Sequence, residues 1–173
     1  MLLHIPQVLT LAQVTEIRQL LDTTEHWTNG RQSAGSQAQK IKNNLQLDVH
    51  SELYQAISSA ILNTLKQQLL IQSAALPKHI LRPMLNCYQD SGNYGNHVDN
   101  AVQYSSETGQ PVRTDVSITL FLSNPDEYEG GELVVEDSYG THEVKLNAGD
   151  AILYPATSLH RVEPVTAGKR IAA

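Results

Sequence analysis

The chain has 173 residues, with 12 basic and 18 acidic side chains, a formal net charge of −6 and a pI near 5.6. This balance argues against a nucleic-acid backbone as the main partner, because phosphate binding needs a basic face. Hydrophobic residues make up 40% and charged residues 17%, which excludes a disordered chain and indicates one globular domain with a buried core.

A single cysteine, Cys87, rules out an internal disulfide and favours a reducing compartment. The first residues, Met1–Pro6, lack the basic region of a signal peptide. No apolar run approaches the length needed to cross a bilayer. We therefore predict a cytoplasmic protein with neither a membrane nor a nucleic acid as partner.

The first part of the chain has helical periodicity. Apolar residues recur at helical spacing from Thr10 to Asp22, and Thr10 with Gln13 forms a capping-box pattern. A polar, glycine-rich stretch at residues 29–36 predicts a loop. A second helix is predicted from Ser51, a good N-cap, to about Leu70.

The predicted helical part of the chain ends at Pro77, since proline interrupts a helix, and a β-rich part follows. We predict that residues 1–76 form a helical part that packs on a sheet, and that residues 77–173 form a β core. The final residues, Gly168–Ala173, have the pattern of a strand that is just beginning, so we expect this core to be truncated at its C-terminal end.

Beyond Pro77, short β-prone segments follow one another at spacings of roughly 8–12 residues, which is typical of a sandwich or jelly roll. The fold class predicted is therefore α+β, mainly β, with N-terminal helices packed on the sheet. The predicted strands cover residues 80–88 (with Pro83 at a bulge or edge), 113–123, 132–136, 141–146 and 151–154.

His97 and Asp99 lie two residues apart, so in an extended chain both side chains point to the same face. With the distant His160 they give the two histidines and one carboxylate that bind iron in non-haem Fe(II) oxygenases. A His-x-Asp pattern alone is weak, and the other histidines are ordinarily surface or core residues. The order of further motifs strengthens it: Gly130-Gly131-Glu132-Leu133 and a Gly149-Asp150 turn precede His160.

Arg170 follows His160 by ten positions, so the two share a face if the intervening turn keeps register. A guanidinium could bind the far carboxylate of a dicarboxylate co-substrate through two parallel hydrogen bonds. Lys169 is the competing cation and would point to the opposite face. Taken alone, Arg170 is better explained as a surface residue near a chain end.

Together these motifs resemble the Fe(II)/2-oxoglutarate-dependent oxygenase superfamily, and most closely the bacterial PKHD-type hydroxylases, which are related to the prolyl 4-hydroxylase catalytic domain. The resemblance extends to Ile5–Thr10 and Trp27–Arg31, and so covers nearly the whole chain. The motifs that carry it are Tyr88…Tyr94…His97-Val98-Asp99, Gly130–Leu133, Ala148–Ala151 and His160-Arg161-Val162…Gly168–Ala173.

The resemblance implies a distorted double-stranded β-helix that hydroxylates a substrate with O2 and releases succinate and CO2. It implies Fe(II) bound by His97, Asp99 and His160, 2-oxoglutarate bound by Arg170, and L-ascorbate as reductant. The Tyr88 hydroxyl could bind the 2-oxoglutarate carboxylate, although a core tyrosine is an equally good explanation. The substrate, a small molecule or a peptidyl group, and the oligomeric state cannot be read from the chain.

Two other functions fit parts of the pattern. A cupin-like module could use the same sheet to bind a metal or small ligand without turnover, since fold does not fix function. Such a module has no need of Arg170 as a dicarboxylate anchor. A nucleic-acid demethylase would use the same chemistry, but the negative charge and the 5% aromatic content disfavour base stacking and phosphate binding.

Overall fold

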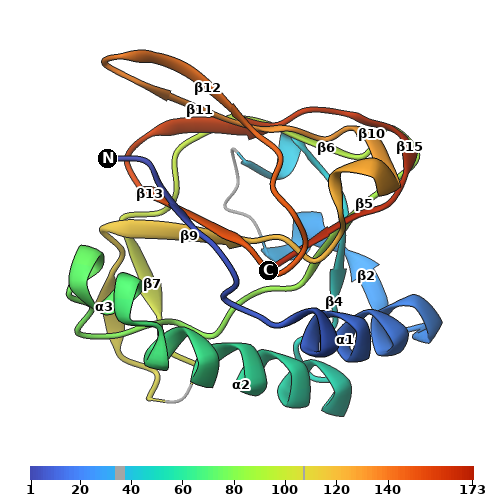
Figure 1. Cartoon of the computed structure of the whole chain (residues 1–173), viewed down its shortest axis with the longest axis horizontal. Coiled ribbons are helices and arrows are strands. Elements are labelled where there is room, and N and C mark those ends of the chain that lie inside the picture. Colours follow the sequence, from blue (N-terminus) through green and yellow to red (C-terminus); the bar gives the residue numbers. More distant parts are fainter. Residues whose placement is uncertain (34–37, 107) are drawn as a thin grey trace.

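A computed structural model describes residues 1–33, 38–106 and 108–173. Two antiparallel sheets face each other, and the helices lie along one side of them (Figure 1). This is the mainly β jelly roll with packed helices that the sequence predicts. None of the helices in the described ranges has the length and apolar character of a membrane span. The helices are α1 (Leu11–Thr23), α2 (Glu52–Gln67) and α3 (Leu69–Ala75), with 3-10 turns at Gly30–Ser33, Ala38–Lys40 and Pro125–Glu127.

Helix α1 begins as its capping box predicts. The Thr10 hydroxyl accepts a hydrogen bond from the Gln13 backbone N–H at 3.2 Å, and the Gln13 side chain accepts one from the Thr10 N–H at 2.9 Å. Both bonds satisfy backbone donors that would otherwise be unpaired at a helix start. The helix buries one apolar face, made of Val14, Ile17 and Leu21, against the core.

The prediction of one helix from Ser51 to Leu70 is wrong at its C-terminal end. Ser51 does cap α2, accepting from the Tyr54 N–H, but the helix ends at Gln67. Gln68 has an extended ψ of 110°, and its N–H bonds to the Leu65 carbonyl at 3.3 Å, so the chain changes direction there. The change of direction lets α3 bury Ile71, which is 4% exposed.

The larger sheet contains strands from both ends of the chain. A bridge between Phe121 and Ala172 joins its two halves, and Leu120 and Ala173 exchange backbone hydrogen bonds of 2.8 and 2.9 Å beside it. In spatial order its strands are β1 (Leu3–Ile5), β13 (Ala151–Pro155), β9 (Val116–Leu120), β16 (Arg170–Ala172), β5 (Asn86–Tyr88), β4 (Leu45–Leu47) and β2 (Trp27–Asn29).

The smaller sheet holds the two histidine-bearing strands side by side. Its order is β12 (Gly140–Val144), β11 (Leu133–Asp137), β14 (Leu159–Val162), β6 (Asn93–His97) and β3 (Lys42–Asn43). The β11–β12 hairpin projects from the top of the molecule in Figure 1. Two further pairs are β10 (Tyr128–Gly130) with β15 (Val165–Gly168), and β7 (Val102–Tyr104) with β8 (Pro111–Arg113).

Two strand predictions and one loop prediction need correction. The strand expected from residue 80 begins only at Asn86, because residues 80–85, with Pro83 lacking an N–H, form no ladder. The strand expected over 113–123 is divided between β8, which ends at Arg113, and β9. Residues 29–33 of the expected loop form the end of β2 and a 3-10 turn, and residues 34–36 lie outside the described residues.

The N-terminal part does more than cover the sheet with helices, since β1 to β4 all lie before residue 76. The division of the chain at residue 76 stays a prediction.

Two hydrophobic cores hold these layers together. One lies between the helices and the larger sheet, and the other lies between the two sheets. The β9 segment contributes side chains to both cores, because successive side chains along a strand point to opposite faces. Val116, Ile118 and Leu120 contact the first core, whereas Phe121, just after the strand, is fully buried in the second. The remaining space between the sheets is where the candidate site lies.

Candidate active site

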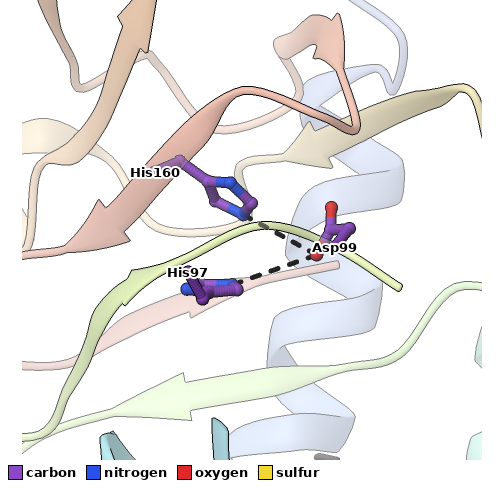
Figure 2. A group of neighbouring side chains, drawn as sticks. All are labelled: His97, Asp99 and His160. Atoms are coloured by element: carbon purple, nitrogen blue, oxygen red, sulfur yellow. Dashed lines mark ion pairs between the residues drawn. The ribbon is translucent and has the colours of Figure 1, made fainter. Parts of the chain in front are cut away.

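Three side chains converge at the end of β6. His97 and His160 are direct cross-strand partners on β6 and β14, which places their side chains on one face at close range. Asp99 follows β6, and its Oδ1 lies 3.9 Å from His97 Nε2 and 3.7 Å from His160 Nε2. Figure 2 shows both rings directed at this carboxylate. One ligand atom from each residue lies within 4.8 Å of the other two, close enough to share one metal ion.

Backbone carbonyls fix which nitrogen of each ring can bind a metal. The Gly95 carbonyl lies 2.8 Å from His97 Nδ1, and the Ser158 carbonyl lies 3.0 Å from His160 Nδ1. A carbonyl can only accept, so each Nδ1 carries a proton, and in the neutral ring the lone pair is then on Nε2. Such carbonyl contacts are the usual support of metal-binding histidines.

The Asp99 carboxylate is held in one orientation. Its Oδ2 accepts a hydrogen bond from the Ser117 hydroxyl of β9, and its backbone N–H donates to the Ala156 carbonyl at 3.1 Å. The other oxygen, Oδ1, is the one that faces both Nε2 atoms. The arrangement therefore offers two imidazole nitrogens and one carboxylate oxygen from one side.

Burial keeps His97 in the form that binds metals. Desolvation is the main cause that lowers the pKa of His97, to about 4, and the neighbouring His160 imidazole adds to it. At neutral pH the His97 ring is therefore uncharged, with its Nε2 lone pair available.

Arg170 supplies a buried positive charge at another wall of the same space. It pairs with Tyr88 across β16 and β5 and is only 2% exposed, whereas the neighbouring Lys169 is exposed. The guanidinium carbon lies 5.2 Å from the centre of the Tyr88 ring and 5.4 Å from that of Phe121. Its Nε and Nη2 atoms have no hydrogen-bond partner among the described residues. A buried guanidinium with unpaired donors is costly, so these donors suit an anionic ligand.

One cavity of about 700 Å³ connects these groups. All five residues singled out in the sequence line it: His97, Asp99, His160, Arg170 and Tyr88. Tyr94, Asn86 and Thr119 line it as well. The fold thus brings the five residues together, while their individual roles remain a prediction.

The sequence gives little indication of two further residues at this site. Ser117 reaches Asp99 because β9 lies in the opposite sheet, and no local motif marks that contact. The Tyr154 ring meets His160 edge-on, with centroids 5.1 Å apart. Tyr154 lies in an apolar strand run that indicates only burial.

The three candidate metal ligands and the Arg170 guanidinium fit the expected metal and co-substrate. Two imidazoles and a carboxylate on one side suit iron(II) when adjacent coordination positions must stay open. A guanidinium buried among aromatic rings with unpaired donors suits one end of a dicarboxylate.

Comparison with known proteins gives a consistent result. Residues 83–173 match the family model of the 2OG-Fe(II) oxygenase superfamily. A PKHD-type hydroxylase of Aliarcobacter butzleri is 53% identical over 171 residues, which are 99% of this chain and 75% of that protein.

Solved structures share the fold at low sequence identity. A Trichoplax adhaerens prolyl hydroxylase, in complex with a hypoxia inducible factor peptide fragment, has a TM-score of 0.71 and 16% identity, covering 99% of this chain and 80% of that one. HygX of Streptomyces hygroscopicus, with nickel, 2-oxoglutarate and hygromycin B bound, has a TM-score of 0.63 and 13% identity, with the same coverage of 99% and 80%. The chain therefore belongs to the 2OG-Fe(II) oxygenase superfamily and within it to the PKHD-type hydroxylases, and it is an Fe(II)- and 2-oxoglutarate-dependent dioxygenase.

Proposed function

We propose that His97, Asp99 and His160 hold the Fe(II), and that Arg170 and Tyr88 bind the distal carboxylate of 2-oxoglutarate. The observation that carries this assignment is the Arg170 guanidinium, buried with unpaired donors in the same cavity as the three converging ligands. A metal-binding module without turnover would have no use for that cation. The cupin-like alternative is therefore disfavoured.

Bound Fe(II), with 2-oxoglutarate and O2, would supply the oxidising chemistry that yields succinate, CO2 and a hydroxylated substrate. The residues of the chain have simpler tasks. Arg170 orients the co-substrate from the end where Tyr88 and Phe121 exclude water, which strengthens the carboxylate–guanidinium contact. Ser117 keeps the second Asp99 oxygen turned away from the metal position.

The substrate is proposed to be a small molecule or a peptidyl group that enters the cavity past Tyr94. The range of ligands in the structural neighbours, a peptide fragment in one and hygromycin B in another, supports either class. We also propose L-ascorbate as reductant, on the family resemblance. A cytoplasmic location is proposed on the single, buried Cys87.

The test is an anaerobic titration of the protein with Fe(II) and 2-oxoglutarate, followed by the visible charge-transfer absorption of the ternary complex. The wild-type protein should develop the band. His97→Ala should lose metal binding, and Arg170→Ala should keep metal but bind 2-oxoglutarate weakly. Lys169→Ala is the matched control, because it removes the adjacent, exposed cation.

Succinate release under air separates turnover from binding alone. A folded wild-type protein that gives neither the band nor succinate would refute the proposed site assignment.

A further inference from the structure

A parallel ring stack supports one of the proposed iron ligands. The Tyr94 and His97 rings have centroids 3.6 Å apart and planes inclined by 17°. In the part of the chain that the structure describes, His160 has no such stack, and its two ring neighbours lie at steeper angles: His97 at 50° and Tyr154 at 63°. The two imidazoles are therefore held in different ways, His97 by a flat surface and His160 by edge contacts in the core.

The stack controls a motion that the backbone hydrogen bond leaves free. The bond from Nδ1 to the Gly95 carbonyl fixes one point of the His97 ring but still permits the ring to tilt about that point. Torsions about the bond to an aromatic ring have broad minima, so little else limits the tilt. Because Tyr94 covers one face of the ring, it directs Nε2 toward Asp99 Oδ1 and His160.

Tyr94 is in turn supported from the neighbouring strand. Lys42 on β3 is its direct cross-strand partner and is only 5% exposed. The Lys42 ammonium lies over the Tyr94 ring, 5.3 Å from its centre. The Tyr94 ring is therefore in contact with both the His97 imidazole and the Lys42 ammonium. A cation over a tyrosine face is attracted to it, more strongly when both are shielded from water.

We propose that Tyr94, backed by Lys42, is a positioning residue that sets the direction of the His97 ligand atom and thereby the metal affinity. The inference rests on the proposed function, since it presumes that His97 binds metal. It assigns the role to the ring face of Tyr94 and none to its hydroxyl.

The experiment compares Co(II) binding by wild type, Tyr94→Leu and Tyr94→Phe, using calorimetry and the visible absorption of bound Co(II). Tyr94→Leu should weaken Co(II) binding by about 10–100-fold, the usual effect of losing support behind a metal ligand, and should change the absorption spectrum. Tyr94→Phe keeps the stack and should bind as wild type does. Lys42→Met should change the absorption spectrum less than Tyr94→Leu does, and the spectrum is its readout because removing a charge that interacts with Asp99 also alters the affinity.

Controls separate positioning from general destabilisation. Tyr139→Leu makes the same change at a tyrosine that is 92% exposed and should leave Co(II) binding intact. The thermal midpoint of each metal-free variant shows whether it folds, and Tyr94→Met, which retains bulk without a flat ring, replaces Tyr94→Leu if that variant does not fold.

Two results would overturn the inference: a folded Tyr94→Leu with wild-type affinity and spectrum, or a Tyr94→Phe as impaired as Tyr94→Leu. A wild type that binds no Co(II) would instead remove the proposed metal site itself.

Discussion

At the scale of single residues, we expect Arg170 to favour 2-oxoglutarate binding but to reduce the stability of the ligand-free fold. Its guanidinium is 2% exposed and leaves two nitrogens unpaired, so the metal-free, ligand-free fold bears the cost of a buried charge. Replacing it by an apolar side chain of similar length, Arg170→Met, should raise the free energy of unfolding by on the order of 1–4 kcal/mol, as seen when buried ionic groups are replaced by packed apolar ones. The same variant should no longer bind 2-oxoglutarate.

Thermal denaturation of the metal-free protein measures the first effect, and denaturation of the Co(II)-bound protein with and without 2-oxoglutarate measures the second. Metal-free Arg170→Met should have a higher melting temperature than metal-free wild type. With Co(II) bound, 2-oxoglutarate should raise the melting temperature of wild type and leave that of Arg170→Met unchanged. Lys169→Met, at the exposed neighbour, should leave both quantities near wild type. A clear loss of stability in ligand-free Arg170→Met would show that the guanidinium is stabilised by its surroundings and does not await an anion.

Ser117 provides a second prediction at this scale. Its hydroxyl donates to Asp99 Oδ2, so Ser117→Ala should let the carboxylate rotate and should weaken Co(II) binding by about 10-fold. Ser117→Thr retains a hydroxyl at the same position and should restore most of the affinity. Calorimetric titration of the two variants decides the matter, and equal affinity for Ser117→Ala and wild type would exclude this support.

At the scale of elements, Gly168 ends β15 and sets the register of β16. Its φ is +74°, and a Cβ atom there would lie 2.1 Å from the Glu127 carbonyl oxygen. Gly168→Ala should therefore destabilise the fold well beyond the roughly 1 kcal/mol cost of a left-handed alanine, and should weaken 2-oxoglutarate binding by displacing Arg170.

Gly109 is the matched control, because its φ is +67° and no atom of the described residues lies within 4 Å of a Cβ built there. Gly109→Ala incurs the conformational cost alone. Urea unfolding of both variants isolates the steric contribution. If both alanine variants lowered the free energy of unfolding by the same amount, the contact with Glu127 would make no contribution to stability.

Elements with a strong local pattern are predictable from this sequence, and elements made by distant partners are not. The capping box depends only on Thr10 and Gln13, which are close in sequence, and helix α1 begins where this motif predicts. Strands β3 and β4 are two and three residues long and exist because β6 and β5 pair with them, which no local periodicity reveals. The break at Gln68 is likewise decided by burial of Ile71 in the core.

The same distinction holds at the candidate site. His97 and Asp99 form a local motif, and His160 and Arg170 follow in a recognisable order, so all four can be singled out in advance. Their supporting contacts depend on tertiary geometry. Ser117 reaches Asp99 from the opposite sheet, and Lys42 meets Tyr94 across two strands that are far apart in sequence. The order of motifs along the sequence therefore predicts the candidate ligands, whereas the pairing of distant strands determines which residues support them.

At the scale of the whole molecule, the two sheets shield the His97 imidazole from water, and this links the stability of the metal-free fold to pH. Burial lowers the pKa of His97 from 6.5 to about 4. In the unfolded chain the ring returns to its ordinary pKa, so between pH 6.5 and 4 the unfolded state binds more protons than the native state. The contribution of His97 is therefore fully present above pH 6.5 and is lost as pH falls toward 4.

Urea unfolding of the metal-free protein, with chelator present, at several pH values across this window tests the linkage. The wild-type midpoint should fall steadily as pH is lowered, and His97→Gln, which cannot be protonated there, should show a shallower fall. The carboxylates titrate in both proteins, so the difference between the two curves isolates the buried imidazole. His50→Gln, at an exposed histidine, should keep the wild-type slope. Parallel curves for wild type and His97→Gln would mean that the fold tolerates a charged imidazole between its sheets, and acid sensitivity would then have to originate elsewhere in the molecule.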